Sequence, residues 1–142
     1  MLRFSLAVSL ATSTASPAFA EPSCGLYQYK AVITEVYDGD TVTADIDLGF
    51  HTWRRDEKLR LYGINTPELR GVSDQEKQRG YAARDALRER ILGKEVVICT
   101  IKDRTGADSR GKYGRYLAKV YLGDELLNDW LVAEGHAVRH EY

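Results

Sequence analysis

Val36-Tyr37-Asp38-Gly39-Asp40-Thr41 joins two runs of sequence that both have the alternating pattern of β-strands. Residues 29–36 and 41–48 are rich in β-branched side chains, which favours strands. The second run places four apolar side chains on one face: Val42, Ala44, Ile46 and Leu48. Because Asp-Gly between two such runs is a strong tight-turn signal, the sequence predicts a hairpin with Asp40 at its end.

Further elements follow along the chain. Residues 51–64 are typical of a third strand, which Pro67 ends. Ser73-Asp74-Gln75-Glu76 is a capping box, which predicts a helix from there to about Leu92. The remaining expected elements are a strand over 95–101, a strand over 115–122, and a short helix over 129–134 capped by Asn128.

The order of these elements predicts a fold that is mainly β with helices (α+β). Five short strands cannot protect the edges of an open sheet, so we expect them to close into a small barrel with one long and one short helix. An open five-stranded α+β sheet is the alternative. The 142 residues suffice for one domain.

The first twenty residues are expected to form a secretory signal peptide and no part of that domain. A basic start precedes an apolar run over 4–11, and Ala18-Phe19-Ala20 is an A-x-A cleavage site. We therefore expect cleavage near Ala20, a segment over 21–28, a domain over 29–142, and a periplasmic or secreted protein without a membrane span. A disordered or membrane-anchoring N-terminus is the alternative.

Two cysteines and a net charge of −1 add further constraints. In an oxidising compartment Cys24 and Cys99 can form a disulfide between the N-terminal segment and a central strand, which is one of two interpretations. The alternative is a pair of free thiols, with Cys99 as a small core residue. The near-neutral charge means that any attraction for a polyanion has to come from local clusters.

Asp40 and Arg60 each have two interpretations. An isolated Asp-Gly-Asp is most often turn chemistry alone, but a carboxylate fixed at a sheet end is also a ligand that calcium prefers. Arg60 alternates with Leu59 and Leu61, so it lies on the opposite face of its strand. It is either a solvent-facing side chain or a guanidinium that grips a phosphate.

Two further motifs are ambiguous in the same way. Asn65-Thr66-Pro67-Glu68 is either an ordinary turn or a stiff segment that offers carbonyls to a metal and positions Glu68 as a general base. Lys112-Tyr113-Gly114-Arg115 closes a polar loop over 102–114. That loop is either solvated or a positive lip that recruits a polyanion, with Tyr113 stacking on a base.

Taken in order, these motifs resemble the staphylococcal (thermonuclease-type) nuclease family over roughly residues 29–138. The resemblance implies an OB-like five-stranded barrel with helices, and calcium-dependent hydrolysis of phosphodiester bonds in DNA and RNA. Asn65 stands where the best-studied members have an aspartate, so calcium affinity should be lower. Residue by residue, it implies metal ligands at Asp40, Asn65 and the Thr66 carbonyl, a general base at Glu68, phosphate-clamping arginines at Arg60 and Arg115, and nucleotide contacts at Lys112 and Tyr113.

The leading functional hypothesis is an exported, monomeric, calcium-dependent nuclease acting on DNA or RNA. The alternative is a catalytically weakened, nuclease-like module that binds nucleic acid or protein, for which Asn65 and the near-neutral charge are the reasons. A plain OB-type single-strand binder is a further rival. It requires several exposed aromatic side chains on one barrel face, and the sequence places only Tyr113.

Overall fold

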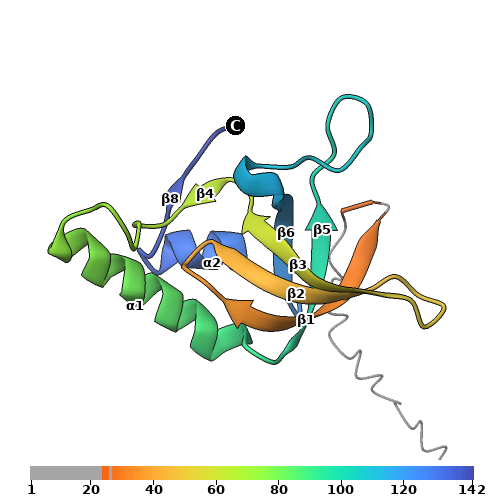
Figure 1. Cartoon of the computed structure of the whole chain (residues 1–142), viewed down its shortest axis with the longest axis horizontal. Coiled ribbons are helices and arrows are strands. Elements are labelled where there is room, and N and C mark those ends of the chain that lie inside the picture. The colour runs from red at the N-terminus through yellow and green to blue at the C-terminus, as the bar shows by residue number, and fades with distance from the viewer. Residues whose placement is uncertain (1–23, 26) are drawn as a thin grey trace, which may run out of the picture.

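The computed structural model describes residues 24, 25 and 27–142 (Figure 1), so the expected signal peptide over 1–20 lies outside the described residues. Its helices and strands are β1 (Gln28–Val36), β2 (Thr41–Asp47), β3 (Trp53–Leu61), β4 (Ile64–Asn65), α1 (Asp74–Ile91), β5 (Glu95–Thr100), β6 (Tyr116–Leu122), β7 (Glu125–Leu126), α2 (Leu127–Ala133) and β8 (Val138–Arg139). A single 3₁₀ turn, Lys112–Gly114, lies between β5 and β6.

Five strands close into a barrel, as expected from the sequence. They pair in the order β3-β2-β1-β5-β6, and β3 then pairs with β6 in parallel, with Leu59 opposite Tyr116 and Leu61 opposite Ala118. The open-sheet alternative is therefore wrong. The third strand is shorter than expected, because the chain turns at Tyr62 and Gly63 before β4 pairs separately with β8.

The barrel interior is apolar and the two helices pack outside it. Leu59 and Leu61 of β3 are fully buried, as the alternation on that strand predicts. The helix α1 begins where the capping box predicts, since the Ser73 side chain accepts a hydrogen bond from the Glu76 amide at 3.2 Å. Its buried stripe includes Ala83, Leu87 and Ile91, while α1 contacts β1 and α2 contacts β6.

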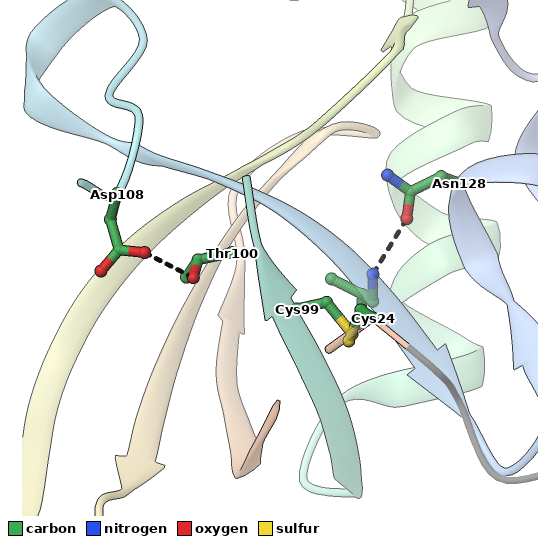
Figure 2. Close-up of a disulfide and its surroundings, with 6 residues drawn as sticks. Cys24, Cys99, Thr100, Asp108 and Asn128 are labelled. Atoms are coloured by element: carbon green, nitrogen blue, oxygen red, sulfur yellow. Dashed lines mark hydrogen bonds between the residues drawn. A yellow bond between two sulfur atoms is a disulfide. The ribbon is translucent and has the colours of Figure 1, made fainter. Parts of the chain in front are cut away.

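Cys24 and Cys99 form a disulfide, which confirms the first of the two interpretations (Figure 2). Their Cα atoms lie 5.9 Å apart, within the usual range for this bond. Cys99 is buried on β5, so the bond ties the segment before β1 to a central strand of the barrel. No helix among the described residues is both long and apolar enough to cross a membrane.

Asn128 has a different role from the one expected. The helix α2 begins at Leu127, and its N-cap Leu126 makes no side-chain capping bond. The buried Asn128 side chain instead accepts from the Val120 amide at 3.0 Å and donates to the carbonyls of Tyr62 at 2.8 Å and Ala118 at 3.2 Å. The local capping preference was outweighed by backbone groups of β6 and of the turn after β3.

Asn128→Ala is therefore expected to destabilise the fold by about 2–4 kcal/mol, because it leaves the buried Val120 amide and the partly buried Tyr62 carbonyl without their partner. Urea unfolding measures this loss. The matched control is Asp129→Ala, whose side chain is exposed and pairs with Arg139 at the surface, so that the expected loss is below about 1 kcal/mol. Equal losses in the two variants would contradict the structural role of Asn128.

Candidate active site

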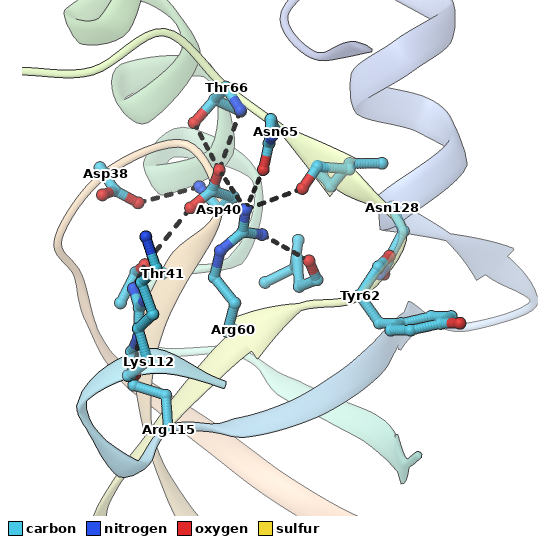
Figure 3. Close-up of polar contacts among 12 residues, drawn as sticks. Asp38, Asp40, Thr41, Arg60, Tyr62, Asn65, Thr66, Lys112, Arg115 and Asn128 are labelled. Atoms are coloured by element: carbon cyan, nitrogen blue, oxygen red, sulfur yellow. Dashed lines mark hydrogen bonds and ion pairs between the residues drawn. The ribbon is translucent and has the colours of Figure 1, made fainter. Parts of the chain in front are cut away.

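The candidate site is assembled where β2, β3 and β6 lie side by side (Figure 3). Thr41 is opposite Arg60 in the β2–β3 ladder, and Arg60 is opposite Leu117 in the β3–β6 ladder. Arg115 immediately precedes β6, so barrel closure brings it next to the other two. The guanidinium of Arg115 donates to the Thr41 hydroxyl at 2.8 Å.

Asp40 does more than complete the hairpin turn. It is only 7% exposed, and its Oδ2 accepts from the Thr66 amide at 2.9 Å and from the Thr66 hydroxyl at 3.1 Å. The same oxygen lies 3.2 Å from the Arg60 guanidinium, and Oδ1 accepts from Thr41. One carboxylate thus joins the β1–β2 turn, β3 and the segment after β4.

Arg60 is buried, so the solvent-facing interpretation of this residue is wrong. Its Nη1 donates to the Leu61 carbonyl at 2.6 Å, and its Nη2 donates to the Ile64 carbonyl at 2.8 Å and to the side-chain oxygen of Asn65. Together with Asp40, these acceptors surround the guanidinium with oxygen atoms. The arginine therefore holds Asp40 and Asn65 in place as well as carrying a charge at this position.

The turn that carries Lys112, Tyr113 and Arg115 is the most exposed part of the site. Arg115 Nε donates to the Lys112 carbonyl at 3.1 Å, and the Lys112 residue itself is exposed. Tyr113 is 92% exposed, adopts a positive φ of 60°, and lies with its ring 5.6 Å from the Arg115 guanidinium carbon. This arrangement presents an aromatic ring and two cations to solvent.

Two basic residues of the same loop already have partners. Lys102 pairs with Asp108, and the Arg110 guanidinium lies 4.1 Å from the centre of the Tyr116 ring. Asp103 organises the loop tip by accepting from the Thr105 and Ala107 amides. The cations that the loop presents are therefore fewer than its composition indicates.

Glu68 is exposed in the irregular segment between β4 and α1. It makes no hydrogen bond or ion pair with any other residue that the structure describes, so its carboxylate is available. Because it follows Thr66 by two residues, their Cα atoms lie within about 7 Å of each other. The structure thus brings Asp40, Asn65, Thr66, Arg60 and Arg115 together and places a free carboxylate on the same segment.

Sequence reasoning missed two members of this cluster. The sequence indicates Asp38 only as a turn former, and its Oδ1 does accept from the Asp40 amide at 3.0 Å. Burial, together with the nearby negative charge of Asp40, also raises the pKa of Asp38 to about 6. The second omission was the hydroxyl of Thr41, which accepts a hydrogen bond from the Arg115 guanidinium. Their position in one contiguous Asp-Gly-Asp-Thr motif was the available signal.

Gly39 explains how closely the site packs. A Cβ atom at this position would lie 2.7 Å from Thr66 Cγ2 and 2.8 Å from Ala83 Cβ of α1. Because neither contact leaves room for a methyl group, glycine is required for the turn to approach these residues. The β1–β2 turn, the segment after β4 and α1 therefore meet without intervening space.

Comparison with known proteins identifies the family of this chain. Residues 58–142, more than half of the chain, match the family model described as staphylococcal nuclease homologue. The chain belongs to the staphylococcal nuclease family. This confirms the resemblance found in the motifs and the OB-like barrel that it implies. The matched segment of this family member includes Arg60, Glu68 and Arg115, whereas Asp40 precedes it.

Individual relatives agree with the family model. The chain is 33% identical over 119 residues to a thermonuclease of Staphylococcus intermedius, covering 84% of this chain and 64% of that protein. It is 31% identical over 109 residues to a thermonuclease of Staphylococcus hyicus, covering 77% and 57%. An uncharacterized protein of Methanocaldococcus jannaschii is 27% identical, covering 77% and 58%. The chain thus spans about three-fifths of the length of these curated relatives.

Proposed function

We propose that this protein is an exported, calcium-dependent nuclease that hydrolyses phosphodiester bonds of DNA or RNA. The observation that carries the proposal is the meeting of Asp40, Arg60 and Arg115 at one point of the barrel, with the free carboxylate of Glu68 nearby. Two relatives of similar sequence are named thermonucleases. The disulfide supports export, because such bonds persist mainly in oxidising compartments.

The chemistry of the donor atoms fits calcium, which prefers oxygen ligands. Asp40, Asn65 and the backbone carbonyl of Thr66 would hold the ion, with the Asp38 carboxylate beside them. Within the described part of the chain, no three side chains of His, Cys, Asp or Glu gather into a metal-binding group. The proposed site therefore depends on amide and carbonyl oxygens as well as on carboxylates.

The side chains of the site have separate roles in the proposed reaction. Calcium, when bound, supplies positive charge that neutralises a phosphate oxygen and lowers the pKa of water. Glu68 accepts a proton from the attacking water. Arg115 has one terminal nitrogen without a described partner, and it stabilises the charge that develops on the phosphoryl oxygens. Lys112 and Tyr113 contact the nucleotide.

Arg60 contributes differently from Arg115 in this proposal. Both of its terminal nitrogens already donate to protein oxygens. A phosphate therefore reaches Arg60 at Nε, at the second N–H of Nη1, or by replacing one of these acceptors. Its buried charge still lowers the energy of an anionic transition state, because charges interact more strongly where water is excluded.

Single-stranded DNA with calcium, and then with a chelator, tests the proposed activity directly. We expect cleavage that requires calcium and stops when the chelator is added. Binding of DNA without cleavage at high calcium would contradict the nuclease. It would instead favour the alternative, a nuclease-like module that binds nucleic acid, and would direct attention to Asn65.

Asn65→Asp is expected to lower the calcium concentration needed for half-maximal cleavage by about tenfold, because each added ligand charge strengthens calcium binding. The Arg60 guanidinium that donates to the Asn65 side chain can equally donate to a carboxylate. A calcium titration of the cleavage rate measures the shift. Asn65→Ala is the control, because it removes the side-chain ligand and should raise the calcium concentration needed. An unchanged midpoint in Asn65→Asp would remove this residue from the calcium site.

A further inference from the structure

A groove beside α1 gathers positive charge and aromatic rings outside the site described above. Its cavity volume is about 320 Å³, and its lining includes Arg70, Lys77, Arg84, Arg88, Tyr37 and Tyr81. Glu35 is the acidic residue of the lining. The whole chain has a net charge of −1, so this cluster is a local region of positive charge.

The helix α1 fixes most of this surface. Lys77, Tyr81, Arg84 and Arg88 follow one another at intervals of four, three and four residues, which places them along one face of a helix. The neighbouring stripe of α1, which includes Ala83 and Leu87, is buried against the barrel. The cations are therefore held on an ordered helix face.

The cations of this groove differ in how far they are already engaged. Arg84 pairs with Asp85 at 2.7 Å, and Arg88 donates to the Val36 carbonyl at 3.0 Å. Lys77 lies 6.0 Å from the centre of the Tyr81 ring, and Arg70 has no hydrogen bond or ion pair to any residue with described coordinates. Arg70 and Lys77 are both exposed and are thus the cations most available to an anion.

The groove is continuous in sequence with the candidate active site on two segments. Tyr37 directly precedes Asp38, and Arg70 follows Glu68 by two residues. The packing at Gly39 presses the first segment against Thr66 and α1. A ligand that leaves the active site along these segments therefore meets the groove.

We propose that this groove binds a single strand of nucleic acid a few nucleotides away from the bond that is cleaved. The inference rests on the proposed function and adds a second place where the substrate is held. Arg70 and Lys77 bind backbone phosphates, while Tyr37 and Tyr81, which are 47% and 37% exposed, stack on bases. Nearness in sequence to the candidate active site, at Tyr37 and Arg70, favours a nucleic acid over an acidic protein or a membrane surface.

The test compares two double variants of the full protein with equal changes of charge. Arg70→Glu with Lys77→Glu alters the groove. Arg79→Glu with Lys94→Glu is the control, since both of these cations are exposed and neither lines the groove.

The probe is a fluorescent thymidine strand of about twelve nucleotides, titrated with a chelator present so that it is not cut. A p-nitrophenyl ester of thymidine 5′-phosphate, cleaved with calcium, reports on the active site alone.

We expect the groove variant to bind the strand at least about tenfold more weakly than the native protein, with a much smaller change in the control. Loss of two phosphate contacts should also reduce the salt dependence of log Kd by about 1.4, or about 0.7 for each contact. The rate on the short ester should be unchanged. Tyr81→Ala should weaken binding of the strand by about fivefold or more.

The contrary outcomes separate the two proposals. Equal affinity of the two double variants for the strand would overturn the groove while leaving the nuclease intact. Binding through the groove without calcium-dependent cleavage would overturn the nuclease and leave the groove. If the native protein binds acidic phospholipid vesicles or polyglutamate but not the strand, the groove does not bind nucleic acid and its proposed ligand is wrong.

Discussion

Glu68→Gln should reduce the rate of calcium-dependent cleavage by about 10²–10⁴-fold, the usual contribution of a positioned general base. The amide keeps the size of the side chain but cannot accept the proton of the attacking water. Because Glu68 is exposed and makes no described hydrogen bond or ion pair, the free energy of unfolding should change by less than about 0.5 kcal/mol. Single-turnover cleavage and urea unfolding, measured on the same preparation, give both quantities.

Glu89→Gln is the matched control for this experiment. Glu89 is an exposed carboxylate on α1 that lines neither the site nor the groove, so its removal should leave both rate and stability unchanged. A Glu68→Gln protein that cuts as fast as the control would show that another group accepts the proton. The arrangement of Asp40 and the two arginines would then need a different base.

Arg60→Met should destabilise the protein much more than Arg115→Met, although both remove an arginine from the same site. Arg60→Met leaves the buried Asp40 carboxylate without its cation and removes the donor to the Leu61 and Ile64 carbonyls. We expect a loss of about 3–5 kcal/mol. Arg115 is only partly buried, so the loss for Arg115→Met should stay within about 1 kcal/mol.

Activity should separate from stability in the same pair of variants. Arg115→Met should remain folded yet cut about 10²–10³-fold more slowly, since one donor to the developing charge is missing. Urea unfolding curves and cleavage rates below the unfolding transition measure the two effects. If Arg115→Met cuts normally, or if Arg60→Met is as stable as the native protein, the division of roles between these arginines is wrong.

The sequence allowed prediction of those features that depend on neighbours along the chain. The hairpin around Asp38-Gly39, the capping box at Ser73 and the alternation of Leu59 and Leu61 all follow from local patterns, and the structure contains each of them. Short motifs likewise indicated Asp40, Arg60, Asn65, Thr66 and Arg115, which the structure brings together, but not the contributions of Asp38 and Thr41. Their expected roles remain predictions, which the experiments above test.

Features that depend on distant partners were not accessible in this way. The strands β4 and β8 have two residues each and so show no periodicity. Burial of Arg60 requires Asp40, twenty positions earlier, and carbonyls that become acceptors only after the chain turns. Asn128 has the local signature of a helix cap, but three backbone groups in other elements determine where its amide points.

The parallel contact between β3 and β6 also has a consequence for the order in which the proposed site is assembled. It joins residues 59–61 to residues 116–118, and contacts between such distant parts of a chain form slowly because a large loop must first close. Arg60 and Arg115 lie on the two sides of this contact. A newly made or refolding chain therefore gains its local hairpins before its two arginines meet, and the proposed site is complete only after β3 and β6 have paired.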